Sequence, residues 1–178
     1  EVFEQGEGYY TIEELLNWMI IKSDNTSTNV LINKFNFKYI NDYIKQELKL
    51  ERTEVNRLML DITARKNGKE NYMSQNDMLK TFEALWNKEI LNENLCGFAI
   101  TILKKQRSQN QIMRYIYDNV DFAHKTGVLD FLNHDVGVMN INNQIIYIGV
   151  SVYNCNKKEG NKQIVGEIGK LVYNTILN

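Results

Sequence analysis

Two short polar motifs contain the residues best suited to chemistry, Lys-Thr-Gly at Lys125–Gly127 and Ser-Asp-Asn at Ser23–Asn25. The first motif follows alternating apolar residues at Val120 and Phe122, so we expect it at the end of a β-strand. Lysine supplies a point charge, threonine supplies a hydroxyl donor, and glycine lets a ligand approach the backbone closely. The first motif therefore predicts an anion site.

Helical periodicity dominates the chain before the Lys-Thr-Gly motif. Thr11 and Glu14 form a capping box ahead of a helix that we expect to end near Ile21, where Ser-Asp-Asn interrupts the pattern. Further helices are expected, from the spacing of apolar residues, at about 27–35, 38–48, 75–86 and 92–105, with a short one within 109–117. Residues 1–10 are expected to form a loop. The long polar segment 49–73 is of the kind that is usually functional.

The apolar period changes to two from residue 120 onward. Strands are expected at 120–124, 136–141 and 144–153, and a helix at 161–177. The last two strands must be antiparallel, because a parallel pair needs a long crossover. The fold class is therefore α+β, a helical part followed by an antiparallel three-strand meander and a C-terminal helix. We expect one partial domain over 1–178, mostly helical over 1–118, with the strands and the last helix over 119–178.

Composition excludes several classes of partner. The 178 residues carry a net charge of -1, which argues against a nucleic-acid partner or an anionic membrane surface. No apolar run is long enough to span a bilayer, and no signal peptide is visible in the first residues. Cys96 and Cys155 lack the spacing of metal ligands, and Cys96 is expected to be a buried free thiol rather than part of a disulfide. We expect neither a metal nor a cofactor.

Ser-Asp-Asn and Lys-Thr-Gly are two of the three motifs typical of class A β-lactamases and penicillin-binding proteins. Over nearly its whole length the chain resembles the penicillin-recognising serine hydrolases, specifically class A β-lactamase-like enzymes. The supporting segments are Thr11–Leu16, Ser23–Thr26, Leu50–Glu54, His124–Gly127 and His134–Gly137. Arg57–Asp61 and Asn71-Tyr72 are similar to relatives from a Firmicutes branch.

The resemblance implies a role for each matching residue. Ser23 would relay a proton, and Asn25 would hold the amide side chain of the substrate. Lys125 and Thr126 would bind its carboxylate, Gly127 would belong to the same substrate-binding segment, and the backbone N–H of Val128 would donate to the oxyanion. Glu54 matches the deacylating glutamate of β-lactamases, but the Pro and Leu-x-Asn that follow it in the family are missing. A general base and a solvated loop carboxylate both remain open for Glu54.

The nucleophile of the family is missing from this chain, because none of its five serines begins Ser-x-x-Lys. We therefore expect the chain to be the C-terminal part of a longer protein and inactive alone. We also expect it to need its missing N-terminal segment or to self-associate through an exposed sheet edge.

Three functions are compatible with this resemblance. The first is acylation and hydrolysis of β-lactams, the second is a peptidoglycan D-Ala-D-Ala peptidase or penicillin-binding protein, and the third is a non-catalytic ligand-binding or sensor domain. The substrate would be a β-lactam or a peptidoglycan peptide, and the location extracellular or in the cell envelope. His124 and His134 are expected to be structural, and Asp135 to support its neighbours by hydrogen bonds rather than to act as an acid.

Overall fold

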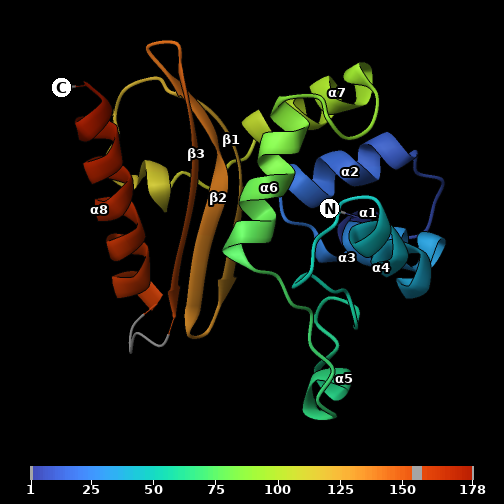
Figure 1. Ribbon diagram of the computed structural model, residues 1–178. Coiled ribbons are helices and arrows are strands. Elements are labelled where there is room, and N and C mark those ends of the chain that lie inside the picture. Colours follow the sequence, from blue (N-terminus) through green and yellow to red (C-terminus); the bar gives the residue numbers. More distant parts are fainter. Residues whose placement is uncertain (1, 154–157, 178) are drawn as a thin grey trace. The chain divides into compact units, whose positions relative to one another are not determined.

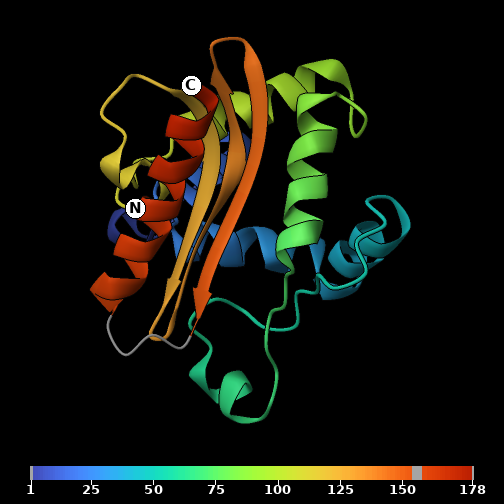
Figure 2. The same cartoon turned by 60° about the vertical axis from the view of Figure 1, so that its left-hand side comes forward.

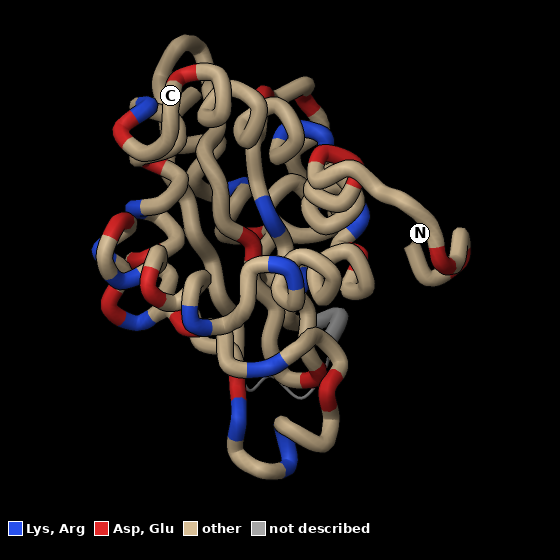
Figure 3. The backbone as a smooth tube through the Cα atoms, turned by 90° about the vertical axis from the view of Figure 1, so that its right-hand side faces the viewer, with Lys and Arg blue, Asp and Glu red and all other residues tan. Residues whose placement is uncertain are grey.

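The computed structural model describes residues 2–153 and 158–177 (Figure 1). The chain divides into two compact units, Glu1–Asp77 and Met78–Asn178, and each has its own hydrophobic core. Among the described residues, no helix combines the length and the apolar character that a membrane crossing needs. Basic and acidic positions are both scattered along the backbone, in keeping with the small net charge (Figure 3).

The first unit is helical. Its helices are α1 (Val2–Gln5), α2 (Ile12–Ile21), α3 (Asn25–Phe35), α4 (Phe37–Gln46) and α5 (Ile62–Lys66). Helices α2 and α3 pack together over a core of Val2, Leu15 and Leu31. The loop predicted for residues 1–10 is therefore wrong at α1, where burial of Val2 in this core holds a helical turn that the local sequence does not predict.

Side-chain caps set the helix starts in this unit. The capping box of Thr11 and Glu14 is confirmed at α2, since each side chain bonds to the backbone N–H of the other residue. Helix α3 begins at Asn25, two residues before the predicted start, because the Asp24 side chain accepts from the N–H of Ser27.

The second unit contains the sheet. It holds most of α6 (Gln75–Trp86), then α7 (Glu93–Lys104), the 3₁₀ turn η1 (Ile112–Tyr115), β1 (Asp121–Leu129), β2 (Leu132–Ile141), β3 (Gln144–Tyr153) and α8 (Lys158–Leu177). The strands form an antiparallel meander in the order β1-β2-β3, which confirms the predicted fold class.

One face of the sheet is covered by α8 (Figure 2). The core on this side combines residues of η1 and its flank, the strands and α8: Ile112, Met113, Ile116, Phe122, Met139, Ile141, Ile148, Val150, Val165 and Tyr173. Helix α7 packs against β1. The buried free thiol expected at Cys96 is confirmed on α7, whereas Cys155 lies outside the described residues.

Two strand limits differ from the prediction. Strand β1 continues to Leu129, so Lys-Thr-Gly lies within the strand and not at its end. Strand β2 starts at Leu132, four residues before the predicted start. The cause is the pairing of the two strands, which runs without interruption from Asp121↔Asn140 to Leu129↔Leu132. This long-range pairing carries the strand through polar and glycine residues that break the apolar alternation.

Candidate active site

Ser23 lies at a sharp turn between α2 and α3. Its φ of 54° is in the left-handed region, which is uncommon for a residue with a side chain and often marks functional positions. The turn lets the N–H groups of Lys22 and Asp24 both donate to the carbonyl of Trp18, at 3.1 Å each. The side chain of Ser23 is exposed.

The other two residues of Ser-Asp-Asn lie at the start of α3, where Asp24 is the N-cap and Asn25 is the first helical residue. Oδ1 of Asp24 accepts from the N–H of Ser27 at 2.7 Å and from its hydroxyl at 2.9 Å, and Ser27 is fully buried. Asp24 therefore caps the helix, while Asn25 in its first turn is exposed. Ser23 and Asn25 present their side chains at the surface of the first unit, where a ligand can reach them.

Glu54 lies on a long loop whose backbone is held by asparagine side chains. Asn41 donates to the carbonyl of Val55 and accepts from its N–H, both at 2.9 Å. Asn29 makes the same pair of hydrogen bonds with the backbone of Met59: it donates to the carbonyl at 3.1 Å and accepts from the N–H at 2.7 Å. A carboxamide has one acceptor and two donors, so it can pair with a peptide group in the manner of a neighbouring strand.

A third asparagine and a buried carboxylate complete the anchoring of this loop. Oδ1 of Asn71 accepts from the N–H groups of Asn56 and Arg57, at 2.8 and 2.9 Å. Asp77, buried at 3% exposure, accepts from the N–H of Arg52 and from the hydroxyl of Thr53. Sequence reasoning found none of these anchors, which fix the backbone on both sides of Glu54.

The carboxylate of Glu54 has two partners in this arrangement. Nζ of Lys45 on α4 donates to Oε1 at 2.6 Å, and Nδ2 of Asn56 donates to Oε2 at 3.4 Å. The hydrogen bond from Lys45, followed by that from Asn56, lowers the pKa of the Glu54 carboxyl below its ordinary value. The carboxylate is therefore held in its ionised form by one ammonium and one amide group.

Removing Lys45 tests this ion pair. In Lys45→Met we expect the pKa of the Glu54 carboxyl to rise toward its ordinary value, because the main stabilising donor is gone. A ¹³C NMR titration of the side-chain carboxyls measures the change. Lys38→Met is the matched control, since Lys38 pairs with Asp42 on the same helix. An unchanged Glu54 titration in Lys45→Met would show that the pair does not form.

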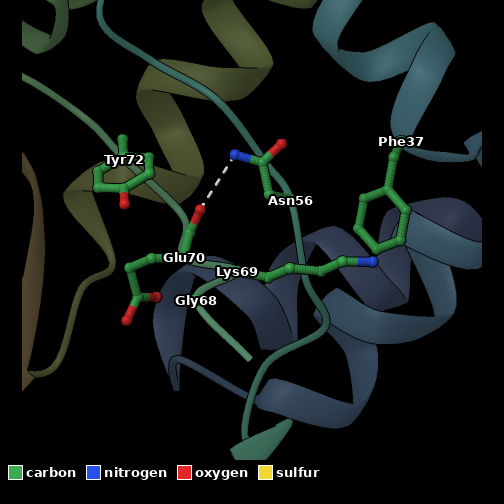
Figure 4. Close-up of a pocket in the computed structure, with 6 residues that line it drawn as sticks. All are labelled: Phe37, Asn56, Gly68, Lys69, Glu70 and Tyr72. Carbon is green, nitrogen blue, oxygen red and sulfur yellow. Dashed lines mark hydrogen bonds between the residues drawn. The ribbon is translucent and has the colours of Figure 1, made fainter. Parts of the chain in front are cut away.

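A pocket of about 320 Å³ lies beside this loop (Figure 4). It is lined by Phe37, Asn56, Gly68, Lys69, Glu70 and Tyr72. Glu70 forms ion pairs with Arg57 and, at 3.1 Å, with Arg65. None of the residues predicted for the site lines this pocket, which is formed by the loop and by Phe37 of α4.

Lys125, Thr126, Gly127 and Val128 lie together on β1 in the second unit. Lys125 is half-buried, and its Nζ donates to the carbonyl of Thr126 at 2.8 Å. Burial lowers the pKa of the Lys125 ammonium to about 8, although the Asp135 carboxylate acts in the opposite direction. Because β1 is an edge of the described three-stranded sheet, alternate residues direct their backbone groups away from β2.

A buried polar pair lies directly beside this segment. Nδ1 of His124 is 2.8 Å from Oδ1 of Asp135, and Oδ2 of the same carboxylate accepts from the N–H of Ile112 at 3.2 Å. The imidazole stacks on Phe122, with ring centroids 4.2 Å apart. His124 and Asp135 are 1% and 0% exposed, so the expected structural role of His124 and the hydrogen-bonding role of Asp135 are both confirmed.

The two groups of predicted site residues belong to different units. Ser23, Asn25 and Glu54 are in the first unit, and Lys125–Val128 are in the second. Within the first unit, Glu54 bonds to Lys45 and Asn56. In the part of the chain that the structure describes, no cluster of three or more His, Cys, Asp or Glu side chains could hold a metal ion.

Comparison with known proteins gives one family. The model of the β-lactamase enzyme family matches residues 3–176. The β-lactamase VEB-1 of Pseudomonas aeruginosa is 25% identical over 202 residues, which cover 94% of this chain and 60% of that protein. The chain thus spans less than two thirds of the length of this curated relative.

Several solved structures have folds similar to that of this chain. A β-lactamase from Sphaerobacter thermophilus superposes with a TM-score of 0.85 at 25% identity, covering 96% of this chain and 65% of that one. PBP-A superposes with a TM-score of 0.85 at 21% identity, covering 99% and 66%. Since the family model covers nearly all of the sequence, this chain belongs to the β-lactamase enzyme family.

Proposed function

We propose that the chain supplies the substrate-binding part of a serine hydrolase that is acylated by β-lactams and then hydrolyses the acyl bond. The observation that carries the proposal is the Lys-Thr-Gly segment on β1, with a half-buried lysine, in a chain whose family match runs from residue 3 to residue 176. A partly desolvated ammonium is a strong partner for a carboxylate.

Each site residue has a role in this proposal. Lys125 and Thr126 bind the substrate carboxylate, Gly127 lets the substrate approach the backbone, and the N–H of Val128 stabilises the oxyanion. Asn25 holds the amide side chain of the substrate, and Ser23 passes a proton between the nucleophile and the leaving group. The exposed side chains of Ser23 and Asn25 and the left-handed backbone at Ser23 are compatible with contact to a ligand.

The acylated serine comes from outside these 178 residues in this proposal, because no serine of the chain begins Ser-x-x-Lys. The chain alone is therefore expected to bind a β-lactam without hydrolysing it. Incubation of the purified chain with a chromogenic cephalosporin tests this directly. Sustained hydrolysis would contradict the assignment of the nucleophile.

Binding of benzylpenicillin to the chain tests the carboxylate site. Lys125→Met should weaken binding by about tenfold or more, the expected effect of losing a charge-assisted hydrogen bond. Binding by the unaltered chain should also weaken by about tenfold between about pH 7 and about pH 9. The sign follows from the ammonium, which is charged below its pKa of about 8 and neutral above it.

Calorimetry or ligand-observed NMR can measure both effects. The control is Lys170→Met, which removes an exposed lysine of the same unit and should leave the affinity unchanged. Equal binding by Lys125→Met and the unaltered chain would overturn the proposed carboxylate site.

A second function is favoured by the ion pair of Glu54. A carboxylate bound by Lys45 and Asn56, with a lowered pKa, is poorly prepared to deacylate an acyl-enzyme. A peptidoglycan D-Ala-D-Ala peptidase or penicillin-binding protein, in which the penicillin adduct persists, would have such a site. Intact mass of the complete gene product after incubation with penicillin distinguishes the two. A persistent adduct favours the peptidase, and loss of penicillin without an adduct favours the lactamase.

The remaining partners follow from the same proposal. Peptidoglycan and β-lactams are met outside the cytoplasm, so we place the protein in the cell envelope or outside the cell. Strand β3 is the second edge of the described sheet, and an edge strand can pair with another segment or another chain. We therefore propose that the chain associates with an N-terminal segment of the same protein or with itself. Light scattering that shows a clean monomer would count against self-association.

A further inference from the structure

The pocket of about 320 Å³ beside the loop of Glu54 has the size of a small-molecule site. Its two aromatic residues come from different elements, Phe37 from α4 and Tyr72 from the base of the loop, where the Tyr72 backbone pairs with that of Glu54. Figure 4 shows the two rings on opposite sides of Asn56. Such a lining suits a ligand ring that has apolar faces and polar edges.

The charges around the pocket favour an anion. Glu70 is the acidic residue of the lining, and its carboxylate is already bound by Arg57 and Arg65. Lys69 is exposed, and its ammonium has no ion pair with the residues that the structure describes. In Figure 4 its side chain extends along the pocket toward Phe37. Two guanidinium groups and one ammonium thus surround a single carboxylate, and the ammonium remains available to a ligand.

Asn56 adds a hydrogen-bond acceptor to the lining. Its Nδ2 donates to the carbonyl of Glu70 at 3.1 Å and to Oε2 of Glu54 at 3.4 Å. Both partners are acceptors, which identifies the other end of the side chain as Oδ1, and in the described part of the chain nothing donates to it. The Glu54 carboxylate is paired with Lys45, so its charge is compensated as well.

We propose that this pocket binds a sugar that carries a carboxylate. Lys69 pairs with the carboxylate, and Oδ1 of Asn56 accepts from an amide or hydroxyl group of the sugar. Phe37 and Tyr72 pack on the pyranose ring, whose C–H faces are apolar and whose edges are polar. The pocket uses none of the residues of the carboxylate site proposed at Lys-Thr-Gly, so it is testable independently of the proposed function.

The test uses N-acetylmuramic acid as the probe. The control ligand is N-acetylglucosamine, which has the same ring and N-acetyl group and lacks the carboxylate. Ligand-observed NMR measures both affinities, and the acid should bind about tenfold more tightly, the effect of one charge-assisted hydrogen bond. Muramic and uronic acids share the proposed chemistry, and glucuronic acid distinguishes them. Tighter binding of glucuronic acid than of N-acetylmuramic acid would identify a uronic acid as the ligand.

Lys69→Met should weaken binding of N-acetylmuramic acid by about tenfold and leave binding of N-acetylglucosamine unchanged. Lys66→Met is the matched control, because Lys66 is an exposed lysine on α5, three residues away, that does not line the pocket. It removes the same charge and should leave both affinities unchanged.

Tyr72→Ala should weaken binding of both N-acetyl sugars by about fivefold, because it removes apolar area that each sugar covers. The hydrogen bonds of Tyr72 to Glu54 are made by the backbone, so the truncated side chain should not disturb the loop. Backbone amide spectra verify that each variant folds.

Chemical shifts locate the bound sugar. Because Asn56 contacts both the pocket and Glu54, the acid should move the ¹³C carboxyl signal of Glu54 and the backbone amide signals of residues 68–72. The amide signals of residues 125–128 should stay in place, and Lys125→Met should bind N-acetylmuramic acid as the unaltered chain does.

Three results would overturn the inference. Equal affinity for the acid in Lys69→Met and the unaltered chain would remove the carboxylate from the pocket. If neither N-acetyl sugar binds at about 10 mM, a concentration that fills even a site with a millimolar Kd, the pocket is not a sugar site. Loss of acid binding in Lys125→Met, with none in Lys69→Met, would move the acid to the Lys-Thr-Gly segment and leave the proposed function intact.

Discussion

Asp135→Ala is expected to destabilise the chain by about 3–5 kcal/mol, as is usual when one partner of a buried ionic or hydrogen-bonded pair is removed. The carboxylate accepts from His124 and from the N–H of Ile112, and all three residues are buried. After truncation, both donors would remain buried without an acceptor. A cavity would also remain between β2 and η1, which the shared carboxylate links.

Urea denaturation of both proteins measures this effect. Asp121→Ala is the matched control, because Asp121 pairs with Lys104 at the partly exposed start of β1 and should cost at most about 1 kcal/mol. A loss in Asp135→Ala no larger than that of the control would mean that the pair with His124 does not stabilise the fold.

Local patterns predicted most of the helices and the last strand. The capping box at Thr11 and the periodicity of α7 gave those helices to within one residue, and β3 has its predicted limits. Helix α1 was missed because it depends on burial of Val2 in a core formed by later residues. The extension of β1 was missed because pairing with β2, and not local alternation, carries it past Lys125.

The site was predictable in residue type but not in its supports. Lys-Thr-Gly and Ser-Asp-Asn are contiguous, so the sequence displays them directly. The clamps from Asn29 and Asn41 to the loop join residues 30 and 14 positions apart. Contacts between a side chain and a distant backbone segment produce no periodic pattern in the sequence, so they could not be predicted from it. The ion pair between Lys45 and Glu54 could not be predicted for the same reason.

Glycine at position 137 is the other feature on which β1 depends. A Cβ at Gly137 would lie 2.3 Å from the carbonyl oxygen of Ala123, 2.6 Å from Cβ of His124 and 2.7 Å from the ring of Phe122. The first two atoms belong to the backbone and the base of a side chain, so neither can move without moving β1. Gly137→Ala should therefore cost about 3 kcal/mol, the upper part of the range for overpacking a core.

Gly97→Ala is the matched control for Gly137→Ala in urea denaturation. Gly97 is exposed on α7, and a methyl group there would meet no heavy atom of the described residues within 4 Å, so alanine should stabilise the chain by up to about 1 kcal/mol. Opposite signs for the same chemical change would show that contact with β1, and not the loss of glycine itself, determines the cost. Because Gly137 is paired with His124, next to Lys125, the variant should also weaken benzylpenicillin binding. Unchanged stability would mean that β1 and β2 can separate to admit the methyl group, and the Lys-Thr-Gly segment would then be less rigidly held than its pairing implies.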